Sequence, residues 1–253
     1  AATSSPPSLL SFLRKNVGKD LSSISMPISI NEPVSILQVL SEAFEYSWLL
    51  NKAAEVQSDE VQRLKYISAF ALSYMSIHRQ KTRSLRKPFT PLLGETYELV
   101  REDMGFRLIS EKVCHKPPVF ASYTEHRSWK CGYTLTPVQK FWGKSIEFTN
   151  EGQFELTFSD VDTKYKWAQP TLVLKNIIAG ERYMEPTNQF TITSSKNIKS
   201  IIAFKSGGMF SGRSEDVDVT IVDDKGKKLG SLKGQWTKGM HDVDTGEEIW
   251  KCG

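Results

Sequence analysis

The feature that most constrains the fold is a change of hydrophobic period near Tyr97. From there on, apolar and polar residues alternate in short segments, which is typical of half-buried strands. Such segments are predicted at Phe106–Ile109, Val119–Tyr123, Tyr133–Leu135, Ile146–Phe148, Phe154–Phe158, Thr171–Leu174, Phe190–Thr193, Lys199–Phe204, Val217–Val222 and Lys228–Leu232. No helical segment separates them, so we expect an antiparallel meander that closes into a barrel, because closure removes exposed edges.

The chain before Tyr97 has a helical period instead. A short amphipathic stretch, Ser8 to Val17, ends at Gly18, a residue type that favours a helix C-terminus. A longer helix is predicted from Pro33 to about Val56, with one side formed by Ile36, Leu37, Leu40, Phe44 and Ser47. A second helix begins after Asp59-Glu60, ends near Arg83, and buries Leu64, Ile67, Ala71 and Met75. The short connection predicts that these two helices pack antiparallel.

This order of segments predicts an α+β protein, mainly β, with helices followed by a large antiparallel barrel in a single domain. Such a wide barrel cannot be filled by its own side chains, so it is plugged by a helix or holds a bulky apolar ligand. Burying about 30 lipid methylenes at about 0.8 kcal/mol each gives a gross gain of about 25 kcal/mol in a closed, dry cavity. The amphipathic stretch before Gly18 is a candidate cover for it.

Composition limits where such a protein works. The 253 residues contain no apolar run of about 18 residues, so we expect no membrane span, and the N-terminus lacks the pattern of a secretory signal. Cys114, Cys131 and Cys252 are too few and too far apart for a disulfide framework or a zinc site, which favours a cytoplasmic protein. The net charge of +4 suits an anionic membrane surface without requiring one.

The motifs do not support an enzyme. The G-x-S-x-G, G-x-G-x-x-G, P-loop and H-E-x-x-H patterns are missing from the sequence. Cys114 and His115 are adjacent on a strand-like segment and point to opposite faces, so they cannot form a nucleophile and base pair. We therefore expect no catalytic residue, no metal and no cofactor.

Nucleic-acid binding is not expected either, because basic residues are scattered among acidic ones. The one dense basic cluster comprises Arg79, Lys81, Arg83, Arg86 and Lys87. It is either a solvated helix end or part of a binding site, and the residues alone leave both interpretations open.

Two long motifs follow that cluster. Lys87 to Glu98 reads KPFTPLLGETYE, and Glu111 to Pro118 reads EKVCHKPP. They resemble the K-P-F-N-P-L-L-G-E-T-[FY]-E and E-Q-V-S-H-H-P-P motifs of the oxysterol-binding-protein-related (ORP/Osh) family. Ile24–Pro33, Glu45–Ser47, Phe141–Glu147 and Asn176–Gly180 resemble other family segments in the same order, so the chain is identified as a member of this family over nearly its whole length.

The resemblance implies a lipid-transfer domain with a hydrophobic tunnel and no covalent chemistry. Its parts would be a lid (1–23), an N-terminal helical part (24–86) and the barrel (87–253). The shared ligand of the family is phosphatidylinositol 4-phosphate, exchanged for a sterol or phosphatidylserine between membranes. Carried over, the head group would be held by Lys87, Thr90, His115 and Lys116. The lid would contact acyl chains or bilayer through Leu9, Leu10, Phe12, Leu13, Leu21 and Ile24.

The chain departs from the family at several positions. Lys116 replaces the second histidine of the fingerprint, Cys114 replaces its serine, and Thr90 replaces the asparagine of the first motif. A lysine at 116 keeps a donor and a fixed positive charge, so phosphate binding is expected to survive. The family continues past Gly234-Gln235-Trp236 into a helical region with further head-group residues, which this chain is expected to lack. A sterol or phosphatidylserine carrier, and a lipid sensor or scaffold that transfers little lipid, are the alternative functions. We expect a peripheral protein at membrane contact sites of the endoplasmic reticulum.

Overall fold

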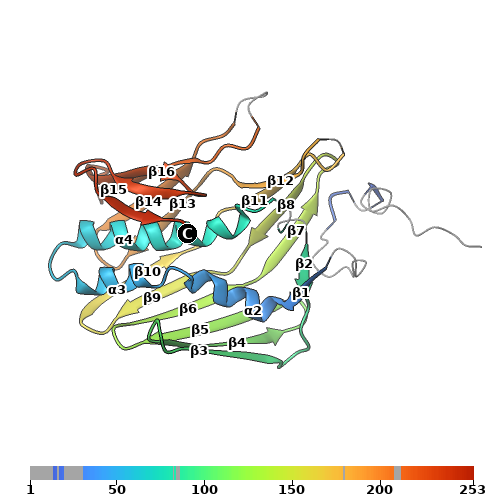
Figure 1. Cartoon of the computed structure of the whole chain (residues 1–253), viewed down its shortest axis with the longest axis horizontal. Helices are drawn as coiled ribbons and strands as arrows, with labels where there is room; N and C mark the ends of the chain where they lie inside the picture. Colours follow the sequence, from blue (N-terminus) through green and yellow to red (C-terminus); the bar gives the residue numbers. More distant parts are fainter. Residues whose placement is uncertain are drawn as a thin grey trace, which may run out of the picture.

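The structure is a computed structural model that describes residues 14–15, 17–19, 31–81, 83, 86–178, 180–207 and 212–253. Within these residues the fold is mainly β, as predicted (Figure 1). The strands are β1 (Asn31–Ser35), β2 (Lys87–Phe89), β3 (Thr96–Arg101), β4 (Phe106–Cys114), β5 (Val119–His126), β6 (Trp129–Leu135), β7 (Pro137–Phe141), β8 (Ile146–Asn150), β9 (Phe154–Phe158), β10 (Val161–Trp167), β11 (Leu172–Lys175), β12 (Tyr183–Pro186), β13 (Gln189–Ser194), β14 (Ile198–Phe204), β15 (Asp216–Asp223), β16 (Lys228–Gln235), β17 (Gly239–Asp242) and β18 (Glu248–Lys251).

The described helices all precede β2. They are α2 (Ile36–Ser41), α3 (Trp48–Glu55) and α4 (Glu60–Ser73), with the short 3₁₀ segments η2 (Glu42–Phe44) and η3 (Tyr74–His78). The Asp59 side chain accepts a hydrogen bond from the Gln62 amide at 2.9 Å, which caps α4 where the sequence predicted its start. No helix in this described part is long and apolar enough to cross a bilayer.

The strands form one large sheet and two small ones. The large sheet has twelve strands in the order β18-β17-β16-β15-β14-β13-β10-β9-β6-β5-β4-β3, and a second sheet has the order β12-β11-β8-β7. The strand pairings in both sheets are antiparallel, as the meander predicted, whereas β1 and β2 form a parallel pair. The second sheet arises because the chain leaves the large sheet after β6 and again between β10 and β13.

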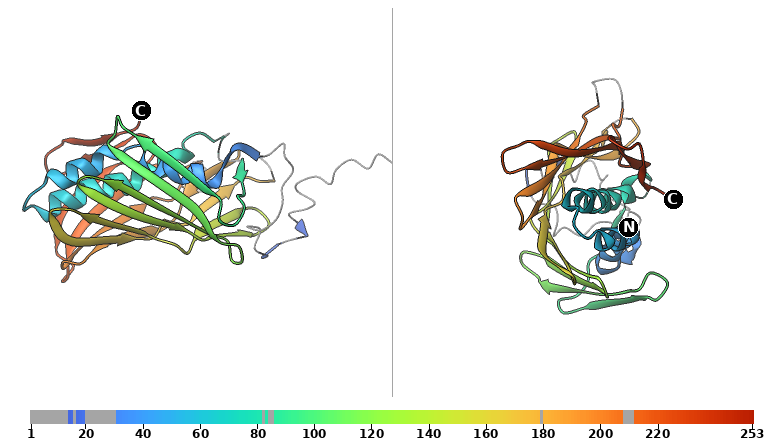
Figure 2. Two further views of the ribbon diagram at one scale, coloured as in Figure 1. Left: turned by 90° about the horizontal axis from the view of Figure 1, so that it is seen from below. Right: turned by 90° about the vertical axis from the view of Figure 1, so that its left-hand side faces the viewer.

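The predicted closure of the barrel is not found in this pairing. Among the described residues β3 and β18 are the two ends of the large sheet, and no pairing joins them. The sheet curls around the helices, as the right-hand view of Figure 2 shows. Helix α4 packs against β14 to β18 and α2 packs against β3 to β5. The helices therefore cover the inner face of both halves of the sheet, which buries it without closure.

Aromatic packing joins the helices to the sheet. Phe44 stacks on Trp129 with ring centroids 6.0 Å apart and also contacts Phe70 and Phe106. The Trp129 indole N–H donates to Asn51 Oδ1 at 2.7 Å, so its polar group is satisfied inside the core. Of the side predicted for the first helix, Leu37, Leu40, Phe44 and Ser47 are buried and Ile36 is half-buried. The predicted stripe of the second helix is buried at all four positions: Leu64, Ile67, Ala71 and Met75.

The prediction of one helix from Pro33 to Val56 was wrong in two places. Asn31–Ser35 is a strand, because it pairs with β2 far along the chain, and the helix begins only at Ile36 after the Ser35 cap. The helix is then interrupted by η2 and a turn before α3 begins at Trp48. The second helix was also predicted too long at its C-terminal end. Helix α4 ends at Ser73, and Tyr74–His78 continues as a tighter 3₁₀ segment.

Candidate ligand-binding cavity

A cavity of about 590 Å³, here called the inner cavity, lies between the four-stranded sheet and the segments α2, η3 and β2. Its volume is within the range of about 300–1,000 Å³ that is common for ligand pockets. Apolar side chains from both sides dominate its lining: Ile36, Val39, Leu40, Met75, Ile77, Leu135, Val138, Ile146, Phe148, Leu172, Leu174, Ile177 and Met184. The inner cavity can therefore receive an apolar ligand by the hydrophobic effect.

Cations border the apolar lining. Arg83, Arg86, Lys87 and Arg182 all line the inner cavity. Arg83 is held by two carboxylates, since its guanidinium contacts Glu32 at 2.6 Å and Glu42 at 2.5 Å. These hydrogen bonds, that of Glu42 foremost, raise the pKa of Arg83 above its usual value. The two carboxylates more than balance the single charge of Arg83, so the positive charge of this border comes from the other three residues.

A small polar group interrupts the apolar wall. The Tyr133 hydroxyl donates to Gln169 Oε1 at 2.9 Å, and Asn150 Nδ2 donates to the same oxygen at 3.4 Å. Asn150 and Gln169 line the inner cavity, and burial raises the pKa of Tyr133, so its hydroxyl stays protonated. The group can hydrogen-bond a hydroxyl of a ligand whose apolar part contacts the neighbouring walls.

His78, at the end of η3, also lines the inner cavity. Burial lowers its pKa to about 4, and the positive charges of Arg83 and Arg213 act in the same direction. His78 is therefore a neutral side chain at neutral pH. It can donate or accept a hydrogen bond there without adding charge.

The two family motifs lie against each other in the structure. The buried Lys112, just before the fingerprint histidine, donates from Nζ to the Pro91 carbonyl at 3.0 Å. The Gly94 amide donates to the Lys112 carbonyl at 2.9 Å, and the Lys112 amide donates to the Glu95 carbonyl at 3.2 Å. The connection from β2 to β3 is thus fixed beside the end of β4, and segments separated in the sequence meet at one end of the molecule.

The four predicted head-group residues are placed differently. Lys87 is half-buried in β2 and lines the inner cavity. Thr90 follows β2 and is exposed, and His115 and Lys116 are exposed in the turn between β4 and β5. These three are not among the residues that line the inner cavity in the described part of the chain. Their contact with a head group stays a prediction.

The predicted lid contacts Leu9, Leu10, Phe12, Leu13, Leu21 and Ile24 lie outside the described residues. The described segment 17–19 between them gives one anchor point, because the Gly18 amide donates to the Phe141 carbonyl at 2.8 Å. Phe141 is the last residue of β7, whose earlier residues line the inner cavity. The chain between the predicted lid residues therefore passes the end of β7.

Sequence reasoning missed several residues of the inner cavity. Arg83 and Arg86 belong to the basic cluster noted before the first motif, so a signal for them was present. Nothing in the local pattern points to Arg182, Asn150 or Gln169, because the folding of distant strands brings them to the same wall. Three or more His, Cys, Asp or Glu side chains placed to hold a metal ion are not found among the described residues.

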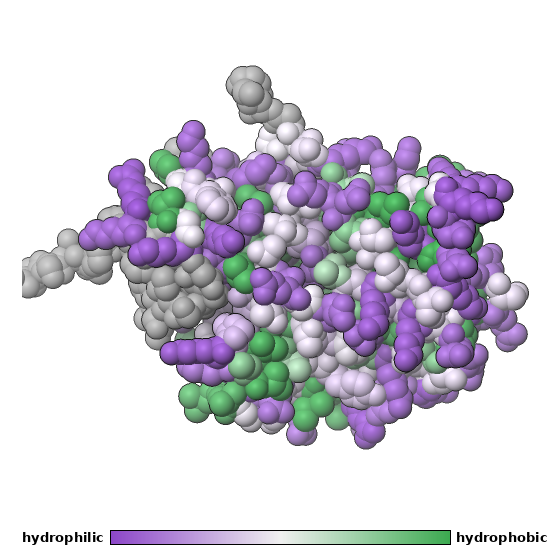
Figure 3. Space-filling model, turned by 180° about the vertical axis from the view of Figure 1, so that it is seen from behind, coloured by the Kyte–Doolittle hydropathy of each residue, from purple (hydrophilic) through white to green (hydrophobic). Residues whose placement is uncertain are grey.

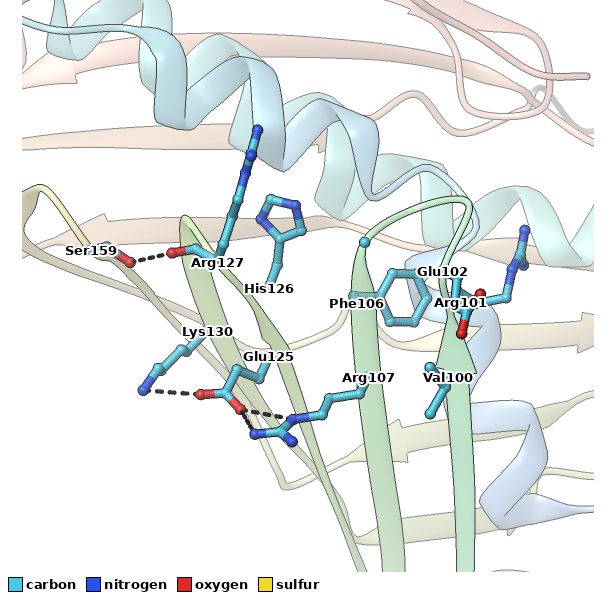
Figure 4. Close-up of a pocket in the computed structure, with 11 residues that line it drawn as sticks. Val100, Arg101, Glu102, Phe106, Arg107, Glu125, His126, Arg127, Lys130 and Ser159 are labelled. Carbon is cyan, nitrogen blue, oxygen red and sulfur yellow. Dashed lines mark hydrogen bonds and ion pairs between the residues drawn. The ribbon is translucent and has the colours of Figure 1, made fainter.

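A second depression, here called the far-end hollow, has a volume of about 580 Å³ and lies on strands β3 to β6 and the turns that join them. Figure 4 shows Arg107 from β4 and Lys130 from β6 both directed at Glu125 from β5. The ion pairs measure 2.6 Å and 3.2 Å, and the Arg107 side chain is 74% exposed. The buried His126 ring stacks on Trp129 beneath these charges. The hollow is a charged surface feature above the core.

The profile of the oxysterol-binding protein family matches residues 8–250. The chain belongs to this family. It is 58% identical over 254 residues to oxysterol-binding protein homolog 3 of Saccharomyces cerevisiae, which covers 100% of this chain and 25% of that protein. Human oxysterol-binding protein-related protein 1 is 41% identical over 240 residues, covering 94% of this chain and 25% of that protein. The chain thus spans about a quarter of the length of these curated relatives.

Two solved structures of this family share the fold. The Osh3 ORD of Saccharomyces cerevisiae in complex with PI(4)P matches with a TM-score of 0.90 and 59% identity, over 100% of this chain and 67% of that one. The Osh1 ORD in complex with cholesterol matches with a TM-score of 0.85 and 28% identity, over 100% and 65%. Membership confirms the prediction of a lipid-binding domain of this family that is not an enzyme.

Proposed function

We propose that this domain binds phosphatidylinositol 4-phosphate and carries it between membranes. The observation that carries the proposal is the inner cavity, whose apolar walls are bordered by Arg86 and Lys87. The 59% identity to the Osh3 ORD that was crystallised with PI(4)P supports this choice of lipid. The apolar walls would surround acyl chains, and the cations would lie beside the phosphorylated inositol.

The chemistry of the border suits a phosphate monoester. Guanidinium and ammonium groups form charge-assisted hydrogen bonds with phosphate oxygens, about twice as strong as neutral ones. Thr90, His115 and Lys116 would add donors from the two motif segments that Lys112 holds together. Lys116 would offer an ammonium donor where the family motif has a histidine.

Transfer implies a peripheral protein that works at two membranes, and we extend the proposal to the cytoplasmic side of contact sites with the endoplasmic reticulum. A second lipid would occupy the inner cavity on the return path. A sterol is the second candidate ligand, because the Tyr133–Gln169–Asn150 group offers hydrogen bonds to a single hydroxyl inside an apolar space. The Osh1 ORD complex with cholesterol is a family precedent for this ligand.

The test is extraction of phosphatidylinositol 4-phosphate from vesicles by the wild type and by the double variant His115→Ala/Lys116→Ala. Losing two charge-assisted hydrogen bonds at about 1.5–3 kcal/mol each should reduce extraction by at least about a hundredfold. The matched control is His241→Ala/Lys251→Ala, which removes the same residue types from exposed positions on β17 and β18. Extraction by His115→Ala/Lys116→Ala equal to that of the control would remove these two residues from the head-group site.

A transfer assay between donor and acceptor vesicles separates carrier from sensor. A carrier moves the labelled lipid to acceptor vesicles with multiple turnovers per protein molecule. A sensor or scaffold binds the vesicles and the lipid but leaves the acceptor population unlabelled. Sterol-loaded donor vesicles in the same assay test the second candidate ligand.

A further inference from the structure

Arg213, shortly before β15, carries a charged side chain that is largely removed from solvent. The side chain is 8% exposed, whereas polar side chains elsewhere are spread over the outer surface, as Figure 3 shows for the rear face. Burying a guanidinium group is unfavourable unless its charge and its N–H groups find partners. The partners of Arg213 therefore indicate its role in the fold.

Arg213 contacts the end of η3 and the carboxylate of Glu215 at the same time. Nη1 donates to the His78 carbonyl at 3.2 Å, and Nη2 donates to the Arg79 carbonyl at 3.3 Å. Nε and Nη2 donate to Glu215 Oε1 at 3.1 and 2.6 Å. The guanidinium carbon lies over the Trp236 ring, 5.1 Å from its centroid. Arg213 thus balances its own charge and satisfies the last carbonyls of η3.

The next residue, Ser214, joins the same segment to the four-stranded sheet. Its amide donates to Glu185 Oε2 at 3.4 Å, and Glu185 is a buried carboxylate of β12 that also pairs with Lys175 of β11. The Ser214 carbonyl accepts from the indole N–H of the buried Trp236 at 3.3 Å. Residues 213–215, here called the clamp, are therefore held against the core and reach both η3 and β12.

Both elements that the clamp reaches are walls of the inner cavity. Met75, Ile77 and His78 of η3 line one side, and Met184 of β12 lines the other. Among the described residues β12 is an end strand of its sheet, so strand pairing holds it on one side only. The hydrogen bonds of the clamp support its other side and hold η3 and β12 at one spacing.

We propose that Arg213 is a positioning residue of the inner cavity, which sets the spacing between η3 and β12 and thereby the width available to the apolar part of a ligand. The inference rests on the proposed function, in which that apolar part is a pair of acyl chains. Arg213 is not among the described residues that line the inner cavity, so its effect on a ligand passes through the two walls. The expected effect therefore falls on the acyl chains and not on the head group.

Arg63 offers a matched control elsewhere in the fold. Its side chain is 1% exposed and donates to the Ala53 carbonyl at 3.1 Å and to Glu60 at 2.7 Å. Its guanidinium carbon lies 5.9 Å from the centroid of the Phe158 ring. Arg63 thus has the same kinds of partners as Arg213, but it joins α3 to α4, and none of these described partners lines the inner cavity.

The experiment measures the affinity of the full chain for a series of soluble phosphatidylinositol 4-phosphates whose acyl chains lengthen stepwise. In the wild type each methylene that enters the inner cavity should raise the affinity by up to about fourfold. Arg213→Met keeps a long side chain but removes the hydrogen bonds that hold the walls. It should bind the shortest lipid within about twofold of the wild type and the longest at least about tenfold more weakly, because the contact of about two methylenes is lost.

Arg63→Met should lower the unfolding temperature and keep the wild-type dependence on chain length. The inference is overturned if a folded Arg213→Met variant keeps that dependence as well. It is also overturned if both variants lose the dependence equally, because lost stability would then explain both. If a methionine variant does not fold, Arg213→Lys and Arg63→Lys decide in the same way, since lysine keeps the charge but cannot reach two carbonyls and a carboxylate together.

Binding of phenylnaphthylamine, an apolar dye without a head group, separates this inference from the proposed function. If the wild type binds no phosphoinositide of the series, the proposed function fails, and the dye then tests the clamp alone. Arg213→Met should bind the dye at least about tenfold more weakly than the wild type, and Arg63→Met should bind it equally well. Equal dye binding by Arg213→Met and the wild type overturns the inference. A wild type that binds neither the lipids nor the dye overturns it too, because the inner cavity would then hold no apolar ligand.

Discussion

The inner cavity and the far-end hollow have nearly equal volumes, about 590 and about 580 Å³, yet they differ in lining and position. The inner cavity is enclosed by two layers, with apolar side chains facing each other and cations on its border. The far-end hollow lies on the outside of β3 to β6, where Arg107, Glu125 and Lys130 already satisfy one another. Volume therefore does not identify the ligand site here, and the lining does.

The cations of the inner cavity and of the far-end hollow differ in their ion-pair partners. At the far end Arg107 and Lys130 share the single carboxylate of Glu125, and such exposed ion pairs contribute only about 0–1 kcal/mol to stability. At the inner cavity Arg83 is neutralised by Glu32 and Glu42, while Arg86 and Arg182 have no ion pair within the described residues. Within the described residues, the inner cavity is therefore distinguished by cations without an ion-pair partner, Arg86 and Arg182, beside its apolar walls, and not by its net charge.

Removing two cations from the inner cavity, or two from the far-end hollow, should give the largest difference in lipid affinity between variants. Arg86→Ala/Lys87→Ala should weaken binding of phosphatidylinositol 4-phosphate by about a hundredfold, since each charge-assisted hydrogen bond contributes about 1.5–3 kcal/mol. Arg107→Ala/Lys130→Ala changes the net charge by the same amount and should leave the affinity within about twofold. Titration calorimetry with a short-chain lipid measures both. Equal losses in the two double variants would mean that the overall field, and not the border of the inner cavity, holds the head group.

Placing a tryptophan ring in the inner cavity should weaken lipid binding by a smaller factor, and the same ring in the far-end hollow should leave lipid binding unchanged. Val138→Trp on β7 adds a large ring inside the inner cavity, so acyl chains lose volume and affinity should fall by about tenfold. Val100→Trp adds the same ring to the far-end hollow, where Val100 is exposed, and should not change lipid binding. Lipid extraction from vesicles, with thermal unfolding as the folding control, measures the difference. Unchanged extraction by a folded Val138→Trp variant would place the acyl chains elsewhere.

The contrast between the two places was only partly predictable from the sequence. The motif KPFTPLLGETYE and the basic cluster before it pointed to Lys87, because local sequence carries both signals. The walls of the inner cavity were not predictable, since they combine α2 and η3 with β7, β8, β11 and β12. The predicted set also missed strands, namely β1, β2, β3, β7, β10, β12, β17 and β18. Strands β17 and β18 have only four residues each, which is too short for a clear alternation. Strand β10 does alternate, with Thr163, Tyr165 and Trp167 buried, so a signal for it was present.

The errors in the helical part have a related cause. Pro33 suggested a helix start, but Asn31–Ser35 pairs with β2, more than fifty residues later in the chain. That pairing brings Glu32 to Arg83 and sets Lys87 beside Asn31, so the misassigned segment builds the border of the inner cavity. Local propensity cannot report a parallel pairing between distant segments. The predicted closure of the barrel is not detected among the described strands, whose inner face is covered by helices.

One histidine with a lowered pKa at each place allows the finest comparison. His78 in the inner cavity has its pKa lowered to about 4 by burial and by Arg83 and Arg213. His126 in the far-end hollow has its pKa lowered by burial and by Arg127. Both side chains remain neutral in the folded protein at pH values where the unfolded chain, with histidine pKa values near 6.5, binds protons.

Stability should therefore fall as the pH drops below about 6.5, because the unfolded state takes up protons that the folded state refuses. For His78 the loss continues until the pH reaches about 4 and then stops. Each histidine contributes less than about 1.4 kcal/mol per pH unit. His78→Gln and His126→Gln should each reduce the pH dependence of the unfolding free energy in denaturant titrations at several pH values.

Binding of phosphatidylinositol 4-phosphate should shift the ring resonances of His78 and leave those of His126 in place, because only His78 lines the inner cavity. Equal shifts at both rings would show that the two places are coupled, and the distinction between them would then be wrong.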